Sequence, residues 1–497
     1  ASGEILARSS ASGAVFVGLT NPNQVTFSRA QAQTLTVNPA FLTRTLNTGT
    51  AVTLQASNDL TISSDILVNN GSGNGGALTL QAGRSVLINA DITTDNGDLT
   101  IVANEALSAG LIDAQRDPGS AVFTMGAGAD INAGTGNVRL TIASGVGKTN
   151  TASGDMTLRN VTGGTIIAEN LGPSNGNVVV ASGALTASGA GTPLVVAAQG
   201  GNFINSSGAG ALSAAGGRWI VYSQNPGANT LGGLTGSPYY NTTYNPAAPT
   251  ALSASGNRFA YTVAPVLTVT PDDQSREYGD PNAGFTYAIT GFIGGDNPLL
   301  AVSGAPDLTT TATQTSAAGG TYPITASIGT LASDYNYGFS FGAGLLTIDP
   351  ATLSYVADPQ SRLYGDANPA LTGTVTGFKN SDTLGSTTTG TLTFTTTATT
   401  NSNVGSYAID GTGLTVTNAN YVLVQAAANA TALTINPATL TYTADPASRL
   451  YGDANPAFTG TVAGFKNGET VGTATTGTLA FTSPAIGTSN VGSYAID

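Results

Sequence analysis

The feature that most constrains this chain is a ten-residue stretch that recurs at a fixed distance. The sequence SRLYGDANPA stands at residues 361–370 and again at 448–457, and a looser copy, SREYGDPNAG, stands at 275–284. The flanking sequence repeats with it, because LTIDPATLSY at 346–355 matches LTINPATLTY at 433–442, a shift of 87 residues. A period this long is that of a small domain rather than of a solenoid coil. We therefore expect three consecutive copies of one folding unit.

Threonine and valine alternate through these copies, a pattern typical of short strands, so each copy is predicted to be a small all-β module. An immunoglobulin-like sandwich is the simplest form. A β-grasp module with one short helix near residues 377–383 is the alternative. The third copy stops at Asp497, before the counterpart of residues 420–436, so we expect it to display an unpaired strand edge. The predicted modules are residues 265–349, 350–436 and 437–497.

The repeated stretch predicts a compound turn rather than an active site. Gly365 can take a positive φ, and Asp366 can accept hydrogen bonds from backbone N–H groups two residues on. Tyr364 is expected to pack inward, with Arg362 stacked on its ring. A turn also tolerates the proline shift of the first copy better than a catalytic geometry would. The predicted turn residues are Arg276, Tyr278, Gly279, Asp280, Arg362, Tyr364, Gly365, Asp366, Arg449, Tyr451, Gly452 and Asp453.

The first half of the chain has a shorter and less regular period. Nine strand-like runs, from AVTLQA at residue 51 to RWIVYS at 218, follow one another at intervals of about 21 residues, and Gly-Asn or Gly-Asp breaks precede several of them. Units of this size share one core when stacked. Residues 51–217 are therefore predicted to form a right-handed parallel β-helix stem, with an antiparallel sandwich as the alternative. Residues 1–50 are expected to be a β segment that leads into the stem.

Residues 218–264 separate the two halves and are rich in tyrosine, proline and glycine. They contain the single tryptophan of the chain. An open β-helix end exposes strand edges and apolar core, so we expect this segment to be a cap. Trp219 and Tyr222 are its predicted core residues rather than a platform for a ligand.

Composition excludes several classes of function. The chain has no cysteine and no histidine, so it has no disulfide framework, no thiolate zinc site and no histidine-based triad. Its net charge is −13 and its basic residues are scattered, which argues against nucleic acid as a partner. No run of 18 apolar residues is present, so no membrane-inserted helix is expected. We expect no enzymatic activity and no cofactor.

Two stretches carry a family resemblance. NPAFLTRTLNTGTAVTLQASNDLTI at 38–62 and GRWIVYSQNPGANTLGGL at 217–234 resemble the stem of filamentous-haemagglutinin-type exoproteins of the two-partner secretion route, and the YGDxNP copies resemble MBG-type repeats. The resemblance implies a secreted bacterial surface rod that binds a host or neighbouring cell, a glycan or matrix, and that leaves the cell through an outer-membrane secretion partner. It implies no catalytic residues. The family's Asn-Pro-Asn motif is followed here by Gln24 instead of Gly or Leu, so we do not expect an intact secretion domain. Both ends of the chain look like cuts within a longer protein.

Three alternatives stay open. A β-helix can carry polysaccharide-degrading chemistry, for which carboxylates and Lys148 are the candidates. Calcium can bind carboxylates at module junctions, for which Asp349, Asp358 and Asp366 are the candidates. The chain can also be a filament subunit, with residues 13–19 donated as a strand to the third module of a neighbour. The candidate stem carboxylates are Asp91, Asp95, Asp98, Asp113, Asp130 and Asp155.

Overall fold

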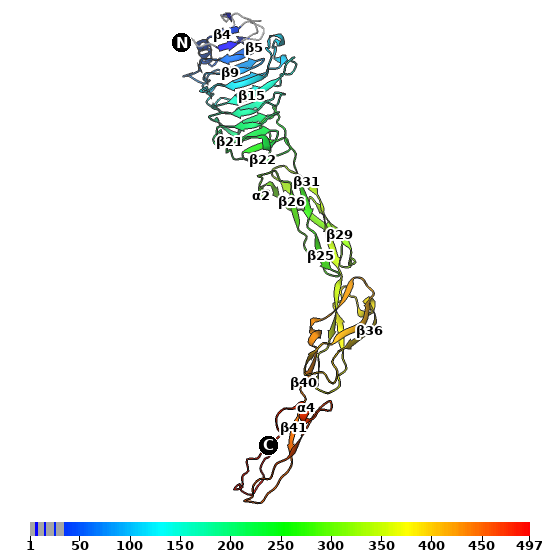
Figure 1. Cartoon of the computed structure of the whole chain (residues 1–497). Coiled ribbons are helices and arrows are strands. Elements are labelled where there is room, and N and C mark those ends of the chain that lie inside the picture. Colours follow the sequence, from blue (N-terminus) through cyan, green and yellow to red (C-terminus); the bar gives the residue numbers. More distant parts are fainter. Residues whose placement is uncertain (1–4, 8–13, 16–23, 26–33) are drawn as a thin grey trace. The chain divides into compact units, whose positions relative to one another are not determined.

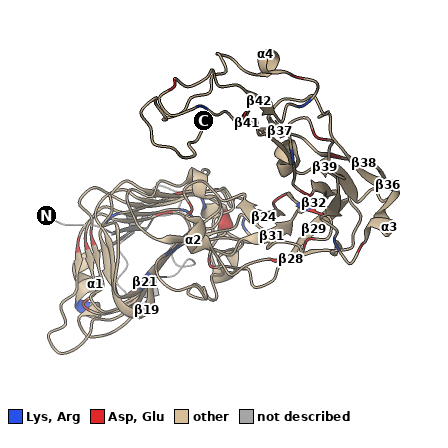
Figure 2. Ribbon diagram, turned by 90° about the horizontal axis from the view of Figure 1, so that it is seen from below, with Lys and Arg blue, Asp and Glu red and all other residues tan. Residues whose placement is uncertain are grey.

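The computed structural model describes residues 5–7, 14–15, 24–25 and 34–497 (Figure 1). They divide into two compact units. The first unit comprises residues 1–269, 289–307 and 327–341, and the second comprises residues 270–288, 308–326 and 342–497. The chain is all-β, as predicted. Charged residues are sparse among uncharged ones (Figure 2), and no helix of the described residues is long and apolar enough to cross a membrane.

The stem in the first unit is a parallel β-helix with three faces (Figure 1). The first face consists of β6 (Leu60–Ile62), β9 (Val86–Ile88), β12 (Ala121–Met125), β15 (Ser153–Leu158), β18 (Val178–Val180) and β20 (Phe203–Asn205). The second consists of β5 (Val52–Ala56), β8 (Leu78–Ala82), β11 (Leu99–Ala103), β14 (Val138–Ile142), β17 (Ile166–Asn170), parts of β19 (Leu185–Ala198) and β21 (Leu212–Ser223), β23 (Arg258–Tyr261) and β22 (Ser237–Tyr239). The third consists of β7 (Ile66–Leu67), β10 (Ile92–Thr93), β13 (Ile131–Asn132), β16 (Val161–Gly163) and the other parts of β19 and β21.

The stem core is a set of aliphatic ladders. Strand residues alternate between buried and half-exposed positions. The register aligns aliphatic residues of successive coils, because Leu54 pairs with Leu80, Leu80 with Ile101, and Ile101 with Leu140. Leu80, Ile101 and Leu140 are fully buried. The core is therefore continuous from one coil to the next, which single coils of this size need.

The nine predicted strand runs lie on two different faces. Six of them belong to the second face, whereas those at residues 122, 156 and 178 belong to the first. The interval of about 21 residues therefore mixes two faces and is not the coil length. Coils are longer and unequal, because Leu99 pairs with Val138 across a coil of 39 residues. Its extra residues form a loop with the short 3-10 helices η1 (Leu107–Ala109) and η2 (Asp113–Gln115).

The start of the stem contains one helix that the sequence prediction did not include. The strands there are β1 (Ile5–Ala7), β2 (Ala14–Val15), β3 (Gln24–Val25) and β4 (Thr34–Val37). Helix α1 (Pro39–Leu46) follows, within the segment predicted as β. Its N-cap is Asn38, whose side chain accepts a hydrogen bond from the Ala40 amide at 2.9 Å, and Pro39 stands at the first helical position. Leu42 and Leu46 lie on its buried face.

The first module is divided between the two units. Its strands in the first unit are β24 (Val266–Pro271), β26 (Tyr287–Thr290), β27 (Val302–Ser303), β30 (Ala332–Ser333) and β31 (Gly338–Phe341), with helix α2 (Pro298–Ala301). Those in the second unit are β25 (Gln274–Glu277), β28 (Asp307–Thr310), β29 (Thr321–Ser327) and β32 (Ala343–Asp349). A few terminal residues of these strands cross the division.

The second module lies wholly in the second unit and mixes parallel and antiparallel pairs. Its elements are β33 (Ala351–Ala357), β34 (Gln360–Leu363), β35 (Gly373–Thr376), α3 (Leu384–Thr387), β36 (Thr388–Thr395), β37 (Gly405–Tyr407), β38 (Asp410–Val416), β39 (Tyr421–Gln425), the 3-10 helix η4 (Ala427–Thr431) and β40 (Leu433–Asn436). β33 runs antiparallel to β35 and parallel to β39, and β34 runs parallel to β40. These parallel pairs differ from a wholly antiparallel sandwich, and α3 starts just after residues 377–383, where the β-grasp alternative expects a helix.

The third module contains one strand pair among its described residues, β41 (Thr441–Ala444) with β42 (Gly460–Ala463), and helix α4 (Val471–Ala474). The pair is antiparallel and corresponds to β33 with β35. The place that β39 takes beside β33 is not filled beside β41, so Tyr442 is 60% exposed. An open strand edge was the expectation for this module.

Candidate functional site

The six candidate carboxylates of the stem do not gather into one site. Each instead accepts a hydrogen bond from a neighbouring coil. Asp91 Oδ1 accepts from the Asp130 amide at 2.8 Å, and Asp98 Oδ1 accepts from the Asn137 amide at 2.8 Å. Asp113 accepts a hydrogen bond from the Thr149 amide, Asp155 from the Asn177 amide, and Asp95 from the Asn70 amide at 2.5 Å. Asp130 accepts a hydrogen bond from the side chain of Asn160. These candidate carboxylates thus form contacts between coils.

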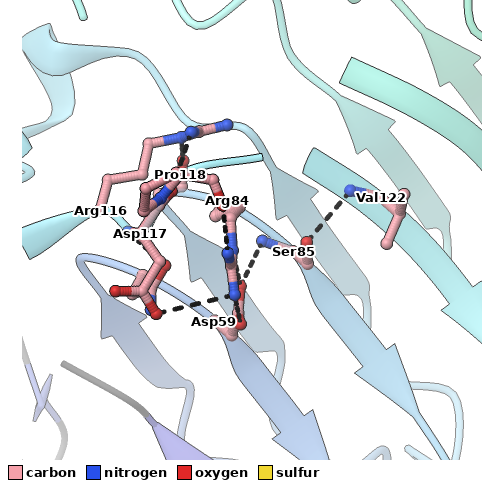
Figure 3. Close-up of polar contacts among 9 residues, drawn as sticks. Asp59, Arg84, Ser85, Arg116, Asp117, Pro118 and Val122 are labelled. Carbon is pink, nitrogen blue, oxygen red and sulfur yellow. Dashed lines mark hydrogen bonds and ion pairs between the residues drawn. The ribbon is translucent and has the colours of Figure 1, made fainter. Parts of the chain in front are cut away.

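A charged cluster holds the loop of the 39-residue coil against the first face (Figure 3). Arg84 donates to both carboxylate oxygens of Asp59 and to the Pro118 carbonyl at 2.8 Å, and its Nη2 lies 3.8 Å from Asp117 Oδ2. Asp59 also accepts from the Ser85 amide at 3.0 Å. The hydrogen bond with Asp59 raises the pKa of Arg84. Each of the three guanidinium nitrogens of Arg84 and both carboxylate oxygens of Asp59 thus have a protein partner, as a structural clamp requires.

Lys148 is buried close to this cluster, beside Gly83 and Asn104. Its Nζ donates to the Gly83 carbonyl and to Asn104 Oδ1, both at 2.7 Å. Burial, and then the charge of Arg116, lowers the pKa of Lys148 to about 8. A lysine with such a pKa can act as a general base where a substrate reaches it. Here the residue is only 8% exposed and its ammonium serves two oxygens, so it stabilises the loop.

The cap is anchored on the stem through a buried carboxylate. Glu169 is 1% exposed, and its Oε1 lies 2.7 Å from Arg139 Nη2. Its Oε2 accepts a hydrogen bond from the Tyr244 hydroxyl at 2.6 Å. Burial, and then Glu169, holds the pKa of Tyr244 well above its usual range. Trp219 and Tyr222 are 3% and 5% exposed, which leaves no ring face for a ligand, and their rings pack on Phe259 and Tyr244.

The compound turn of the modules is tied by its arginine and not by its aspartate. Arg362 Nε donates to Asn368 Oδ1 at 2.7 Å, and its Nη2 donates to the Thr399 carbonyl at 2.5 Å. Arg276 and Arg449 make the corresponding bonds to Asn282 and Asn455. The prediction that Arg362 stacks on Tyr364 is wrong, since its guanidinium serves these oxygens instead. The same holds for Asp366, for which the described residues contain no hydrogen bond from a turn amide to its side chain.

In the first two modules, the aspartate of the turn contacts the next module. Asp280 Oδ1 accepts from Lys379 Nζ at 2.5 Å, and Asp366 Oδ1 accepts from Lys466 Nζ at 2.7 Å. The lysine stem lies across the glycine of the turn. A Cβ on Gly365, whose φ is +80°, would stand 2.2 Å from Lys466 Cβ. The glycine therefore does two things: it takes the left-handed conformation and it leaves room for the lysine.

The tyrosine of the same two turns completes this contact. Tyr278 lies edge-on to Tyr421 with ring centroids 5.4 Å apart, and its hydroxyl lies 3.4 Å from Asp382 Oδ2. The Tyr421 hydroxyl donates to that carboxylate at 2.8 Å, and burial raises the pKa of Tyr421 to about 12. In the next copy the Tyr364 hydroxyl donates to Glu469 at 2.9 Å. We call this set of contacts, the turn Tyr-Gly-Asp against a lysine loop and an acidic residue, the joint.

A third contact of this form occurs in the first unit, between the cap and residues 292–337. Tyr240 donates to Asp296 Oδ2 at 2.8 Å, and its ring lies 4.8 Å from that of Tyr337. Tyr337 donates to the same carboxylate, as Tyr421 does in the joint. Asn241 has a φ of +51° and stands where the turn has its glycine. The cap therefore presents a tyrosine followed by a left-handed residue, like the turns of the modules.

The three repeated modules match a known protein family. Residues 267–347, 353–431 and 440–497 match the MBG domain (YGX type). The three modules are MBG domains. No curated protein and no solved structure matches the chain.

In the part of the chain that the structure describes, the turn of the third MBG domain contacts no lysine loop. Tyr451 is 65% exposed, against 6% for Tyr278 in the first MBG domain. Gly452 has a φ of +93°, and no atom lies within 4 Å of the position that a Cβ would take. Within the described part of the chain, the side chain of Asp453 makes no hydrogen bond or ion pair.

The candidate calcium ligands do not converge. Asp366 pairs with Lys466, and Asp358 Oδ2 accepts from the Thr372 hydroxyl at 2.7 Å. Asp272 with Thr286 and Asp445 with Thr459 repeat that second contact in the other MBG domains. Among the described residues, no three acidic residues come close enough to hold a metal ion.

Sequence reasoning missed the lysine loops and the acidic residues of the joints. The signal was present, because the letters GFKN recur at residues 377–380 and 464–467, again 87 apart. From the sequence alone, these letters indicate only the place of a short helix. Asn380 and Asn467 both have a positive φ, so the loop that presents each lysine is a left-handed turn rather than a helix.

Proposed function

We propose that this protein is a non-enzymatic extracellular structural protein, in which a β-helix stem and a series of MBG domains form a stalk for adhesion at a bacterial surface. MBG-type domains are typical of extracellular adhesin-like repeat proteins. The β-helix stem is also the fold that the filamentous-haemagglutinin resemblance implies. The partners are a host or neighbouring-cell surface, a glycan or matrix, with an outer-membrane secretion partner during export.

The observation that carries the proposal is the joint. A flexible string of domains needs no contacts between neighbours. The joint between the first and second MBG domains, in contrast, combines an ion pair, a tyrosine–carboxylate hydrogen bond and an aromatic contact. The second boundary repeats the ion pair and the tyrosine–carboxylate bond. Pro350 and Pro437 stiffen the chain at these boundaries. Fixed neighbours suit a protein that holds one end away from the other under load.

The polar residues of the stem support a structural role. The candidate carboxylates link successive coils, and Lys148 is enclosed by protein oxygens. Polysaccharide-degrading chemistry needs two carboxylates that face a bound sugar, and these carboxylates accept bonds from backbone and side-chain groups instead.

Distance measurement across one joint tests the proposal. The chain has no cysteine, so spin labels on Thr391→Cys and Thr478→Cys, at equivalent exposed positions of the second and third MBG domains, report on that boundary alone. We expect a narrow distance distribution in the parent chain. The charge reversal Asp366→Lys, which places two cations together, is expected to broaden it. A distribution as broad in the parent as in the variant would show independent domains and would contradict the stalk.

Adhesion itself is tested with beads that carry the full chain through a tag at its C-terminal end. We expect capture by cell or matrix surfaces at a level that EDTA does not change, because no metal cluster is found among the described residues. Absence of capture on all such surfaces would contradict a role in adhesion, and only the role as a stalk would remain.

The filament alternative remains a prediction. Its proposed donor, residues 13–19, lies mostly outside the described residues. Of that stretch the structure describes β2, which pairs parallel with β4 within the first unit. A donor strand from this segment would have to give up that pairing.

A further inference from the structure

The three contacts described above differ at one matched pair of positions. Where the turn has glycine and aspartate, the opposite loop has a lysine: Asp280 faces Lys379, and Asp366 faces Lys466. Where the cap has Asn241 and Thr242 instead, the corresponding loop has Ile293. The aspartate and the lysine are thus present together or absent together, whereas the tyrosine and the acidic residue are kept in all three.

Elementary electrostatics explains why the two positions change together. A lysine placed over a neutral turn would lose part of its hydration without gaining an anion, and an aspartate beneath an isoleucine would lose part of its hydration without gaining a cation. Both mismatches weaken the contact. The pair therefore decides which loop can follow which turn, while the tyrosine supplies contact area in every case.

The free turn of the third MBG domain is already in the form that the other two have when engaged. Arg449 donates to Asn455 Oδ1 at 2.7 Å and to the Ile486 carbonyl, as Arg362 does to its own partners. The Gly452 amide donates to the Gly487 carbonyl at 3.2 Å, the counterpart of Gly279 with Gln314. Binding would therefore need no ordering of the turn.

The lysine loops within this chain are engaged. Lys379 and Lys466 pair with the turns of preceding domains, and the first MBG domain has Ile293 in place of a lysine. A second copy of the chain can supply a lysine only if it opens one of its own joints. The loop of that copy that contains Ile293 is already in contact with Tyr240 of its own cap.

We propose that Tyr451, Gly452 and Asp453 form a recognition surface for an MBG domain outside residues 1–497 whose Gly-Phe-Lys-Asn loop is not yet engaged. The lysine stem lies across Gly452 and its ammonium pairs with Asp453. The Tyr451 hydroxyl donates to the acidic residue three positions after that lysine, as Tyr364 does to Glu469. An MBG domain with an uncharged residue in the lysine position is rejected.

The test uses the full chain, extended after Asp497 by a copy of residues 411–436, which complete the third MBG domain, and a copy of residues 350–436, which supply a lysine loop. The parent has no cysteine. One cysteine replaces Gly487 and a second replaces the counterpart of Asn380 in the added copy, and a short bis-maleimide joins them when the surface is occupied. The matched control is Thr400→Cys with Asn467→Cys in the same chain, where Asn467 Nδ2 lies 3.0 Å from the Thr400 carbonyl.

We expect cross-linking at the new boundary to match the control, and Asp453→Lys to lower it about fivefold. Changing the lysine of the added copy to Asp in the Asp453→Lys chain is expected to restore it. Asp453 has no partner among the described residues, so this substitution leaves the third MBG domain folded, which circular dichroism checks. Cross-linking that is unaffected by Asp453→Lys would overturn the proposal.

A mixing experiment tests the choice of partner. Parent-length chains with the single substitution Gly487→Cys are mixed with chains that carry only Asn380→Cys, and the same linker is added. We expect no cross-linked dimer, since Lys379 of each chain is engaged by its own Asp280. A dimer would show that a second copy occupies the surface and would overturn the assignment to a separate MBG domain.

Discussion

The stem and the MBG domains bury their β surfaces to different extents within a single repeat. In the stem, Leu80, Ile101 and Leu140 belong to one ladder that runs through successive coils, so no coil has a core of its own. In the second MBG domain a cluster of six buried residues belongs to that domain alone, and the Arg362 turn adds polar contacts. Its Ala351, Leu353 and Tyr421 belong to a second cluster, which is shared with the first MBG domain. Damage to the stem core is therefore expected to spread between coils, whereas damage to this cluster of six residues is expected to stay within the second MBG domain.

The largest expected effect tests the shared core. Phe123 is fully buried in β12 and pairs with Val86 and Met156 of the neighbouring coils. Phe123→Ala is expected to lower the free energy of unfolding of the stem by about 3–5 kcal/mol and to raise hydrogen exchange in β9 and β15 as well as in β12. The control is Phe394→Ala, a half-buried phenylalanine that packs against the cluster of six residues in the second MBG domain, whose effect is expected within residues 350–436. Faster exchange in β12 alone would contradict a shared core.

A smaller effect tests how local the turn is. Arg362→Met removes the charge-assisted bonds to Asn368 and Thr399, and is expected to cost the second MBG domain about 2 kcal/mol. Forced unfolding of the full chain, in which domains open one by one, resolves this as one weakened event. Arg449→Met is the control, since Arg449 makes the same bonds in a more exposed turn and a smaller loss is expected there. Equal weakening of all unfolding events would contradict the expectation that the Arg362 turn stabilises only its own domain.

The smallest effect concerns pH. The pKa of Lys148 is about 8 when folded, below the 10.5 of an ordinary lysine, so the unfolded chain binds more protons between these values. The free energy of unfolding of the stem should therefore rise as the pH goes from 8 to 10. In Lys148→Met this rise should be absent, although the variant is less stable throughout because Gly83 and Asn104 lose a donor. The two pH profiles, measured by urea unfolding, would run parallel if Lys148 titrated normally.

The parts of the fold that were predictable are those set by neighbouring residues. Alternation within VTLQA and LTLQA identified β5 and β8, and the fixed repeat identified the modules. The coil length was not predictable, because strands of two faces have the same alternation. Contacts such as Tyr244 with Glu169, 75 residues apart, leave no local pattern. Asp366 was assigned to its own turn because its partner, Lys466, is 100 residues away.

The glycine beneath the lysine has a consequence for how such a series of domains changes in number. Each of the second and third MBG domains carries both halves of the joint, a Tyr-Gly-Asp turn and a lysine loop. A gene duplication that copies one such repeat therefore produces neighbours that already fit, and unequal recombination can lengthen or shorten the array by whole repeats. Conversely, a point mutation that replaces Gly365 changes one repeat but disturbs the next one, because the new side chain would occupy the space of Lys466. The first MBG domain, with Ile293, is fitted to the cap and fixes where the series starts.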